Sequence, residues 1–600
     1  MKQGAGQEDE RAMSGEADVS VAEEKARGLS EEAVKKTGRG FLIITAAKVW
    51  FLVTSAVIQL GLPILLGSAE KFGIFKIVTE SIGLINMVMI TGTLHGVSKL
   101  VSEEPEKANG LVNLAVKMQC LLGVPVAALY FLASPVIAEG FNDPTLTPLL
   151  RLSALIIFFY AFYAIFVGYF NGLKEFVNQA SLDFTFSTVK MIGIVGLVLL
   201  GFGVTGAVAG FVGAAGFIAI SAGAWVMLRI RRGPKQHWES GAAKESVKRL
   251  LGYLVLIMVY TFALNGVMRA DLFVLKSVAG SVPVHLSGME ELFVLMSNKF
   301  AGFYGAVLNI ARIPYQGVIA VTFVIFPLIS EATFREDRNQ TKGYIRETFR
   351  YCILLIGLVA MVLAFNSDSI IAGLYSVDYQ QASVALSILS VSIIFFALFY
   401  VACTMIIGSG HPLAAAVIMG ISLGVSGVAN FFLVRRVHEE TMAGLERVEV
   451  ARGGETPMEI VGGAVEMARA NADFAGNFLV ESTRYMQSAA IATTVAMVLG
   501  FVISVGWLWH RFGAAPPWAT VARVLLVAGV LFGINGLIGL PVELVEVHGK
   551  LVYLGMVVGK MGVMGVVALV VLIAAREFTA TDMSRLQAVL GRKKKSEGEV

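Results

Sequence analysis

The sequence predicts an all-α protein that crosses a membrane about fourteen times. Three observations lead to this class. Hydrophobic residues make up 56% of the chain, charged residues make up only 15%, and most charges stand in short segments between long apolar runs. Those runs reach the roughly 20 residues that a helix needs to cross a bilayer. A soluble enzyme held by a single anchor is therefore excluded.

A sliding hydropathy window gives approximate limits for the spans. They are 41–66, 76–98, 109–134, 149–171, 181–201, 205–229, 250–276, 301–328, 346–367, 382–408, 412–434, 487–509, 518–540 and 551–574. The segment GFGVTG has to form a tight turn between the fifth and sixth spans. An even number of spans places both ends of the chain on one side of the membrane.

The basic residues indicate which side that is. Loops on the N-terminal side, with the tails, hold roughly 29 Lys and Arg, whereas the short loops on the far side hold about 6. The richest near-side loop reads RIRRGPKQHWESGAAKESVKR, and the far-side loop GFNDPTLTP is acidic. No signal peptide is visible, so the first span is expected to be retained. We therefore expect a multi-pass protein of the cell (plasma or inner) membrane with both termini in the cytoplasm.

Composition divides the chain into six parts. They are a disordered cytoplasmic tail (1–38), an N-terminal six-helix lobe (39–231), a basic cytoplasmic linker (232–249), a C-terminal six-helix lobe (250–510) with an extracytoplasmic insertion (435–486), two extra helices (511–575) and a basic cytoplasmic tail (576–600). Within the insertion, Thr456-Pro457-Met458-Glu459 is typical of a helix start. We expect that helix to run into the twelfth span.

Similar segments recur in the two lobes at intervals of about 230–240 residues. GYFNGLKEFVNQASLDF joins spans four and five, and MIIGSGHPLAAAVIMG joins spans ten and eleven. LGSAEKFGIF after the first span likewise resembles KFAGFYGAV at the eighth. A repeat of this kind is typical of transporters whose substrate binds where the two halves meet.

Six polar residues lie inside predicted spans and are the candidate substrate-binding residues. They are Lys48, Lys190, Asn265, Arg269, Asp271 and Arg312. Each charge at bilayer depth costs about 2.5–3.5 kcal/mol, so these side chains have to be paired or hydrated, which predicts a polar pathway. The five charged ones sum to a net positive charge. Guanidinium groups bind phosphate oxygens through two hydrogen bonds, so an anion such as a lipid-linked diphosphate suits this set.

The same residues have structural explanations that stay open. Lys48 can extend its ammonium group to the inner interface, and Lys190 and Arg312 can serve in structural ion pairs. Arg269 and Asp271 stand two apart and point to nearly opposite sides of a helix.

The helical spacing also predicts neighbours for these groups. Arg269 is expected beside Asn265, four residues earlier. Asp271 is expected to pair with a neighbouring helix through Lys190 or Arg312. Glu80 and Asp183 stand near span ends and are expected at the membrane interface.

Several segments together resemble the flippases of the multidrug/oligosaccharidyl-lipid/polysaccharide superfamily, in its polysaccharide biosynthesis or oligosaccharide-lipid flippase branch. They are LGSAEKFGIF, GLINMVMITGTLHGVSKLVSEE, EGFNDPTLTPLLRLSAL, GYFNGLKEF, the Asn-x-x-x-Arg-x-Asp of span seven, FYGAVLNIARIP, FPLISE and IGSGHP. The resemblance covers about 41–434 and resumes at SAAIATTVAMVLGFVI, so the insertion departs from it. It implies two six-helix lobes around a V-shaped cavity, with two extra helices in some branches. It also implies a transporter that flips a lipid-linked (poly)saccharide precursor from the inner to the outer leaflet by alternating access.

Two other functions remain to be weighed. A multidrug or cation antiporter of the same superfamily needs a carboxylate-rich cavity, and the first span carries Lys48 with no acid. A membrane-embedded glycan polymerase or ligase requires acidic or histidine clusters on an outer loop, where His438 stands alone.

The remaining composition limits cofactors and partners. Cys120, Cys352 and Cys403 lie in apolar spans without disulfide or metal-ligand spacing. The sequence thus predicts no enzyme, no metal site and no cofactor. The expected partners are membrane lipid and a lipid-linked oligosaccharide, with a glycan polymerase or glycosyltransferases as candidates and no nucleic acid.

Overall fold

A computed structural model describes residues 43, 45–232, 255–283, 288–335, 337–451, 472–578 and 582. Within these ranges the regular structure is helical throughout. The long helices of the N-terminal half are Thr45–Leu65, α2 (Ala69–Glu103), α3 (Ala108–Gly140), α4 (Thr147–Gly172), α5 (Phe176–Leu197) and α6 (Gly203–Arg232). Those that follow are Val255–Val267, α8 (Ala270–Ala279), α9 (Glu290–Ala311), α10 (Ile313–Phe334), α11 (Arg338–Phe365), α13 (Ser383–Gly408), α14 (Pro412–Ala451), α16 (Ala472–Phe512), α17 (Trp518–Leu537) and α19 (Lys550–Ala574). Two short helices are α12 (Ser367–Leu374) and α18 (Leu544–His548).

The number of spans agrees with the prediction. In the described part of the chain, 11 helical stretches are long and apolar enough to cross a membrane, or 12 with the bent pair Val255–Val267 and α8. One of the 11 contains both α5 and α6, which turn back on each other at Gly201 (φ 90°) and Gly203 (φ 55°). The rod α9–α10, interrupted only at Arg312, is one further crossing. The predicted tight turn at GFGVTG and the about fourteen spans are thus confirmed.

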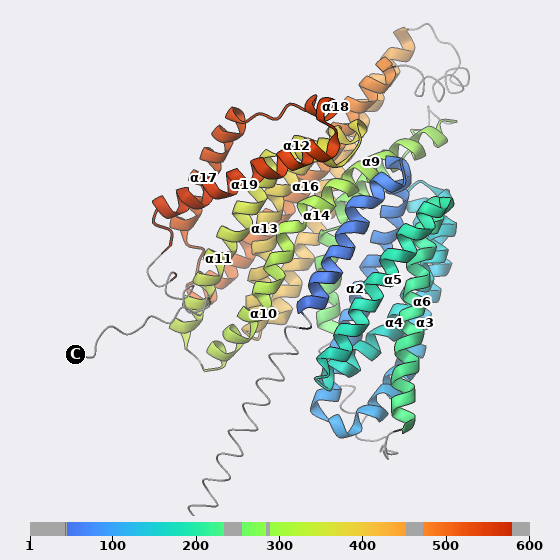
Figure 1. The fold of residues 1–600 in the computed structure, drawn as a ribbon, viewed down its shortest axis with the longest axis vertical. Helices are drawn as coiled ribbons and strands as arrows, with labels where there is room; N and C mark the ends of the chain where they lie inside the picture. Colours follow the sequence, from blue (N-terminus) through green and yellow to red (C-terminus); the bar gives the residue numbers. More distant parts are fainter. Residues whose placement is uncertain are drawn as a thin grey trace, which may run out of the picture.

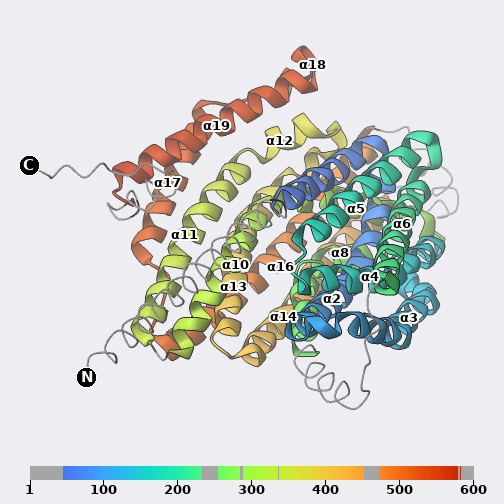
Figure 2. The same cartoon turned by 60° about the horizontal axis from the view of Figure 1, so that its bottom comes forward.

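The helices form two bundles with two extra helices on the outside. Thr45–Leu65 and α2–α6 form the N-terminal lobe, and Val255–Val267 through α16 form the C-terminal lobe (Figures 1 and 2). Helices α17 and α19 pack against α11 and α12 on the side of the C-terminal lobe that faces away from α2–α6. Large apolar side chains on the outer faces are exposed, such as Leu129 on α3 and Leu525 on α17, as expected for surfaces that contact lipid.

The internal repeat is visible in the backbone. Helices α4 and α13 are both 26 residues long, and α13 begins 236 positions after α4 (383 against 147). The loops that follow contain Lys174 and Gly410, which are also 236 positions apart and both have positive φ, 59° and 86°. The two loops that the sequence predicted to match therefore have the same conformation at the same place in each lobe.

Two long helices rise from the C-terminal lobe at the insertion. Helices α14 and α16 have 40 and 41 residues, well beyond the roughly 20 that cross a bilayer. The predicted helix that runs into the twelfth span is confirmed from Ala472 onward, whereas Thr456–Glu459 lies outside the described residues. The same holds for residues 1–38, for 233–249 of the linker and for 583–600.

The seventh and eighth predicted spans differ from the structure. The seventh, 250–276, bends by 51° between Val255–Val267 and α8. The eighth begins at Glu290, eleven residues before its predicted limit of 301, because the segment EELFVLMSNKF continues the helix although it is too polar for a hydropathy window.

The two lobes touch where α2 crosses α9. A Cβ atom on Gly73 would overlap the carbonyl oxygen of Asn298, and one on Gly302 would overlap that of Ala69, so the two backbones are in direct contact. A buried apolar core continues around this crossing and draws on both lobes, with Phe72 and Phe300 among its members. We call this crossing, Ala69–Gly73 with Asn298–Gly302, the closed end of the interface.

Candidate substrate site between the lobes

The bend in the seventh span interrupts its backbone hydrogen bonds, and two charged side chains, those of Arg312 and Asp271, bind the backbone groups that are left free. The carbonyl oxygen of Met268 accepts a hydrogen bond from the guanidinium of Arg312 instead of from the amide of Leu272. That amide donates instead to Oδ1 of Asp271 at 2.8 Å. Both backbone groups freed by the bend are thus satisfied by charged side chains, which stabilises an opening in the helix that would otherwise be costly.

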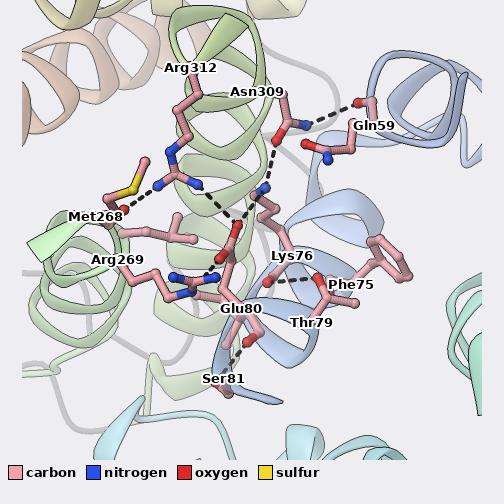
Figure 3. Close-up of polar contacts among 12 residues, drawn as sticks. Gln59, Phe75, Lys76, Thr79, Glu80, Ser81, Met268, Arg269, Asn309 and Arg312 are labelled. Carbon is pink, nitrogen blue, oxygen red and sulfur yellow. Dashed lines mark hydrogen bonds and ion pairs between the residues drawn. The ribbon is translucent and has the colours of Figure 1, made fainter. Parts of the chain in front are cut away.

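Glu80 of α2 lies at the centre of a buried cluster of charges (Figure 3). Its carboxylate is 2.8 Å from Nζ of Lys76, 2.7 Å from Nε of Arg269 and 3.3 Å from Nη1 of Arg312. Lys76 and Glu80 come from the N-terminal lobe, and the two arginines come from the C-terminal lobe. One carboxylate therefore joins three cations across the interface, and the cluster retains two positive charges.

Amide side chains extend the cluster to two more helices. Lys76 donates to Oδ1 of Asn309 at 2.6 Å, and Nδ2 of Asn309 donates to the carbonyl oxygen of Gln59 at 3.0 Å (Figure 3). Nη1 of Arg269 donates to Oδ1 of Asn265 at 2.8 Å. These bonds hold the long cationic side chains in one arrangement.

The cluster forms one wall of a cavity of about 200 Å³ between the lobes. The other residues around this cavity come from the first helix, α2, α5, α6 and α9, and include Gln59, Phe72, Lys190, Phe211 and Asn309. Lys76, Lys190 and Arg269 line it together with a single carboxylate, that of Glu80. The cavity is therefore cationic, and it is bounded by both halves of the repeat.

Lys190 differs from the other cations because it has no anionic partner among the described residues. Its ammonium lies over the rings of Phe51, Phe186 and Phe211, at 5.0, 5.4 and 5.5 Å from their centroids. Aromatic faces attract a cation but do not neutralise it. An anion in the cavity would be the first full counter-charge for this group.

The structure brings four of the six predicted residues to this site. Arg269, Asn265 and Arg312 belong to the cluster, Lys190 lines the cavity, and the expected bond between Arg269 and Asn265 is present. The other two lie elsewhere.

Lys48 is half exposed and pairs with Asp183 at 2.8 Å, within the N-terminal lobe. Asp271 is buried inside the C-terminal lobe and accepts a hydrogen bond from Tyr304 at 2.9 Å. Among the described residues Asp271 forms no direct ion pair with Lys190 or Arg312. Arg312 pairs with Glu80, although its charge also acts favourably on Asp271, and the ammonium of Lys190 lies over aromatic rings.

Lys76 was not among the predicted site residues. Glu80 was expected at a span end on the membrane interface, whereas its side chain is buried. The reason is that α2 begins at Ala69, seven residues before the predicted limit of 76, so both residues lie inside the helix. The signal available was their spacing: Lys76 and Glu80 form an i, i+4 pair on one helix face.

Comparisons with known proteins identify a matching family model and a related protein. Residues 38–333 match the family model for "Polysaccharide biosynthesis protein". The chain is 24% identical over 414 residues to the "Uncharacterized membrane protein YabM" of Bacillus subtilis (strain 168), covering 66% of this chain and 75% of that protein.

Solved structures that share the fold include two transporters. The lipid II flippase MurJ in an inward closed conformation matches with a TM-score of 0.60 and 12% identity over 90% of this chain and 99% of that one. A multidrug resistance MATE family transporter of the MOP superfamily in an inward-facing conformation matches with a TM-score of 0.51 and 13% identity over 75% of this chain and 97% of that one. The chain thus has the fold of these two transporters, and its residues 38–333 match the polysaccharide biosynthesis protein family.

Proposed function

We propose that this protein flips a lipid-linked (poly)saccharide precursor from the inner to the outer leaflet by alternating access. The observation that carries the proposal is the cavity between the lobes, where the described lining has three cations, Lys76, Lys190 and Arg269, and one carboxylate, that of Glu80. Such a cavity suits an anionic group that is attached to a lipid, and a diphosphate linker is such a group. The lipid tail stays in the bilayer while the head group crosses between the lobes.

In this proposal each cation has a distinct part. The guanidinium groups of Arg269 and Arg312 bind diphosphate oxygens through paired hydrogen bonds. Lys190, which has no anionic partner in the described part of the chain, attracts the anion into the cavity. Lys76 is held by Asn309 and completes the site, and Asn265 orients Arg269. Glu80 pairs with both arginines when no substrate is bound, so substrate binding has to displace it or share its partners.

The direction of transport follows from the proposed orientation. We propose that the basic loops and both termini lie in the cytoplasm of a cell with this protein in its plasma or inner membrane, and that the six-part division of the chain holds. An anion that leaves a negative interior then gains about 2.3 kcal/mol per charge for each 100 mV. The membrane potential therefore favours outward movement of a diphosphate.

A cation or drug antiporter is the second candidate, because a MATE transporter shares the fold. Such a substrate would need acidic groups in the cavity, and the charge balance around Glu80 is the reverse. The same balance disfavours an enzyme that acts on glycans, because one carboxylate held by three cations is not free to act as a general base. A glycan polymerase and glycosyltransferases remain proposed partners in the same membrane.

A flipping assay tests the proposal. Purified protein is placed in proteoliposomes with a fluorescent lipid-linked diphosphate oligosaccharide, and a membrane-impermeant quencher reports how fast the lipid reaches the outer leaflet. Hydrogen bonds to charged groups contribute about 1.5–3 kcal/mol, so Arg269→Gln and Arg312→Gln should each slow flipping about 10- to 100-fold. Arg350→Gln is the matched control, because Arg350 is equally shielded (18% exposed against 17% for Arg312) but lies away from the cavity.

Three outcomes would contradict the proposal. An unchanged flipping rate in both arginine variants would refute the assignment of Arg269 and Arg312 to the substrate site. A covalently altered glycolipid would favour an enzyme. Transport of cationic dyes without any flipping of the glycolipid would favour the antiporter.

A further inference from the structure

A second set of buried charges joins the two lobes at the closed end, and none of its residues lines the cavity. Asp143 lies in the short link between α3 and α4 of the N-terminal lobe, and Lys276 lies in α8 of the C-terminal lobe. Nζ of Lys276 donates to Oδ2 of Asp143 at 2.9 Å, and neither side chain has any exposed surface.

Every polar atom of this pair is satisfied by a neighbour. Asn298 donates to the same carboxylate oxygen at 2.9 Å, and Lys276 donates a second bond to Oγ of Ser297 at 2.8 Å. The other oxygen of Asp143 accepts from the amide and hydroxyl groups of Thr145 at 3.2 and 2.5 Å. Asn298 is also the residue whose carbonyl abuts Gly73, so the ion pair and the backbone crossing form one contact.

Two more hydrogen bonds link the same segments. Nδ2 of Asn142 donates to the carbonyl oxygen of Ser277 at 2.8 Å, and Oγ of Ser277 donates to the carbonyl oxygen of Gly140 at 2.6 Å. Asn142 has a positive φ of 52°, which asparagine tolerates better than most residues and which turns its amide toward α8. The α3–α4 link and the end of α8 are therefore fastened at three points.

The choice of charges here has a physical consequence. Burying an ion pair is costly, and apolar residues of similar volume would hold two surfaces together as well or better. When the lobes separate, however, both charges become hydrated, and this hydration offsets the contacts that are lost. An apolar contact has no comparable favourable hydration when it is exposed to water. A buried ion pair can thus keep an interface shut and still let it open repeatedly.

We propose that Asp143 and Lys276 form a latch that holds the closed end of the cavity shut and separates once in each transport cycle. This inference rests on the alternating access of the proposed function. Its test needs no substrate, so the latch and the substrate site can fail separately. If the latch variants behave as expected but the arginine variants flip lipid normally, only the substrate site is refuted. If the arginine variants flip slowly but the latch variants do not open, only the latch is refuted.

Spin labels on the two lobes measure the opening. Glu139 near the end of α3 and Glu291 at the start of α9 are both exposed, and each is replaced by a labelled cysteine in the full chain, in lipid nanodiscs. Cys120, Cys352 and Cys403 are replaced by serine or alanine beforehand. Distances come from double electron–electron resonance. The parent should give mainly one short distance. In Asp143→Asn, which leaves Lys276 buried without a carboxylate, the population with a longer distance should rise at least about tenfold.

Two further variants make the test decisive. The double variant Asp143→Leu with Lys276→Met removes both charges, so its longer-distance population should not exceed that of the parent. Glu577→Gln also neutralises a buried carboxylate paired with arginine, but outside the lobe interface, and should leave the distances unchanged. The latch is refuted if Asp143→Asn gives the distances of the parent, or if Glu577→Gln opens the lobes equally. Should Asp143→Asn fail to fold, a double variant that is more open than the parent would refute it as well.

Discussion

Neutralising Glu80 is the perturbation whose consequences the structure defines most fully. Glu80→Gln keeps the shape of the side chain but leaves three cations close together in a buried site. At an effective dielectric constant of about 20, a unit charge pair at such contact distances attracts by about 5–6 kcal/mol. Repulsion among the cations and the cost of burying them oppose this attraction. Removing one partner of a buried ion pair accordingly costs about 3–5 kcal/mol in net terms.

That loss is a large part of the roughly 5–15 kcal/mol that stabilises a typical domain. The assay is a titration with a denaturing detergent, which gives the apparent free energy of unfolding of the parent and of Glu80→Gln. Inorganic diphosphate at millimolar concentration is then added. It should stabilise Glu80→Gln more than the parent, because it can take the place of the missing carboxylate beside Arg269 and Arg312.

Glu577→Gln is the control for this experiment. Its carboxylate is also buried and pairs with Arg350 at 2.7 Å and with Arg523 at 2.5 Å, so its loss should destabilise the protein as well. It lies outside the cavity, so added diphosphate should not restore it. The reasoning is refuted if Glu80→Gln unfolds within about 1 kcal/mol of the parent, or if diphosphate stabilises both variants equally.

Three shorter predictions concern other parts of the molecule. Gly302→Val should lower the midpoint of thermal unfolding, because its side chain would meet the backbone of Ala69, whereas Gly213→Val, with open space around it, should not; equal midpoints would contradict the close crossing. Lys190→Met should slow flipping while leaving the free energy of unfolding unchanged or higher, because no acid loses its partner; a marked destabilisation would show a missing counter-charge. Burial alone would raise the pKa of Glu577. Hydrogen bonds from Arg350, Arg523 and Thr520 have the larger opposite effect, so the pKa lies below its ordinary value of 4.5. The ionised carboxylate of Glu577 therefore stabilises the protein fully above pH 4.5, and this stabilisation is lost as the pH falls below that value. The free energy of unfolding, measured against pH, should fall at low pH in the parent by an amount that Glu577→Gln does not show. Identical pH profiles of the parent and the variant would contradict the assignment.

The fold could be predicted largely from the sequence, because a bilayer forces each crossing to be a long apolar helix. The turn at Gly201 and Gly203 and the matching loops at Lys174 and Gly410 followed from local glycine patterns and from the repeat. The bend in the seventh span could not be predicted, because a side chain distant in the sequence stabilises it: the guanidinium of Arg312 donates to the carbonyl oxygen of Met268.

The site was predictable only in part, for a similar reason. Charges in the middle of apolar runs, such as Lys190 and Arg269, are conspicuous in a sequence because they are costly there. Glu80 is just as buried but stands near the edge of its apolar run, where hydropathy cannot distinguish a membrane surface from a helix interior. Which cation pairs with which acid depends on how the two lobes pack together. That arrangement involves residues far apart in the sequence, so no local pattern predicts it.

A cryo-electron microscopy structure of the protein with a lipid-linked diphosphate oligosaccharide would show where the diphosphate binds. We expect density for its two phosphorus atoms between the lobes, within hydrogen-bond reach of Arg269 and Arg312 and near the ammonium of Lys190. A diphosphate bound only outside the two lobes, with Glu80 still holding all three cations, would contradict this expectation.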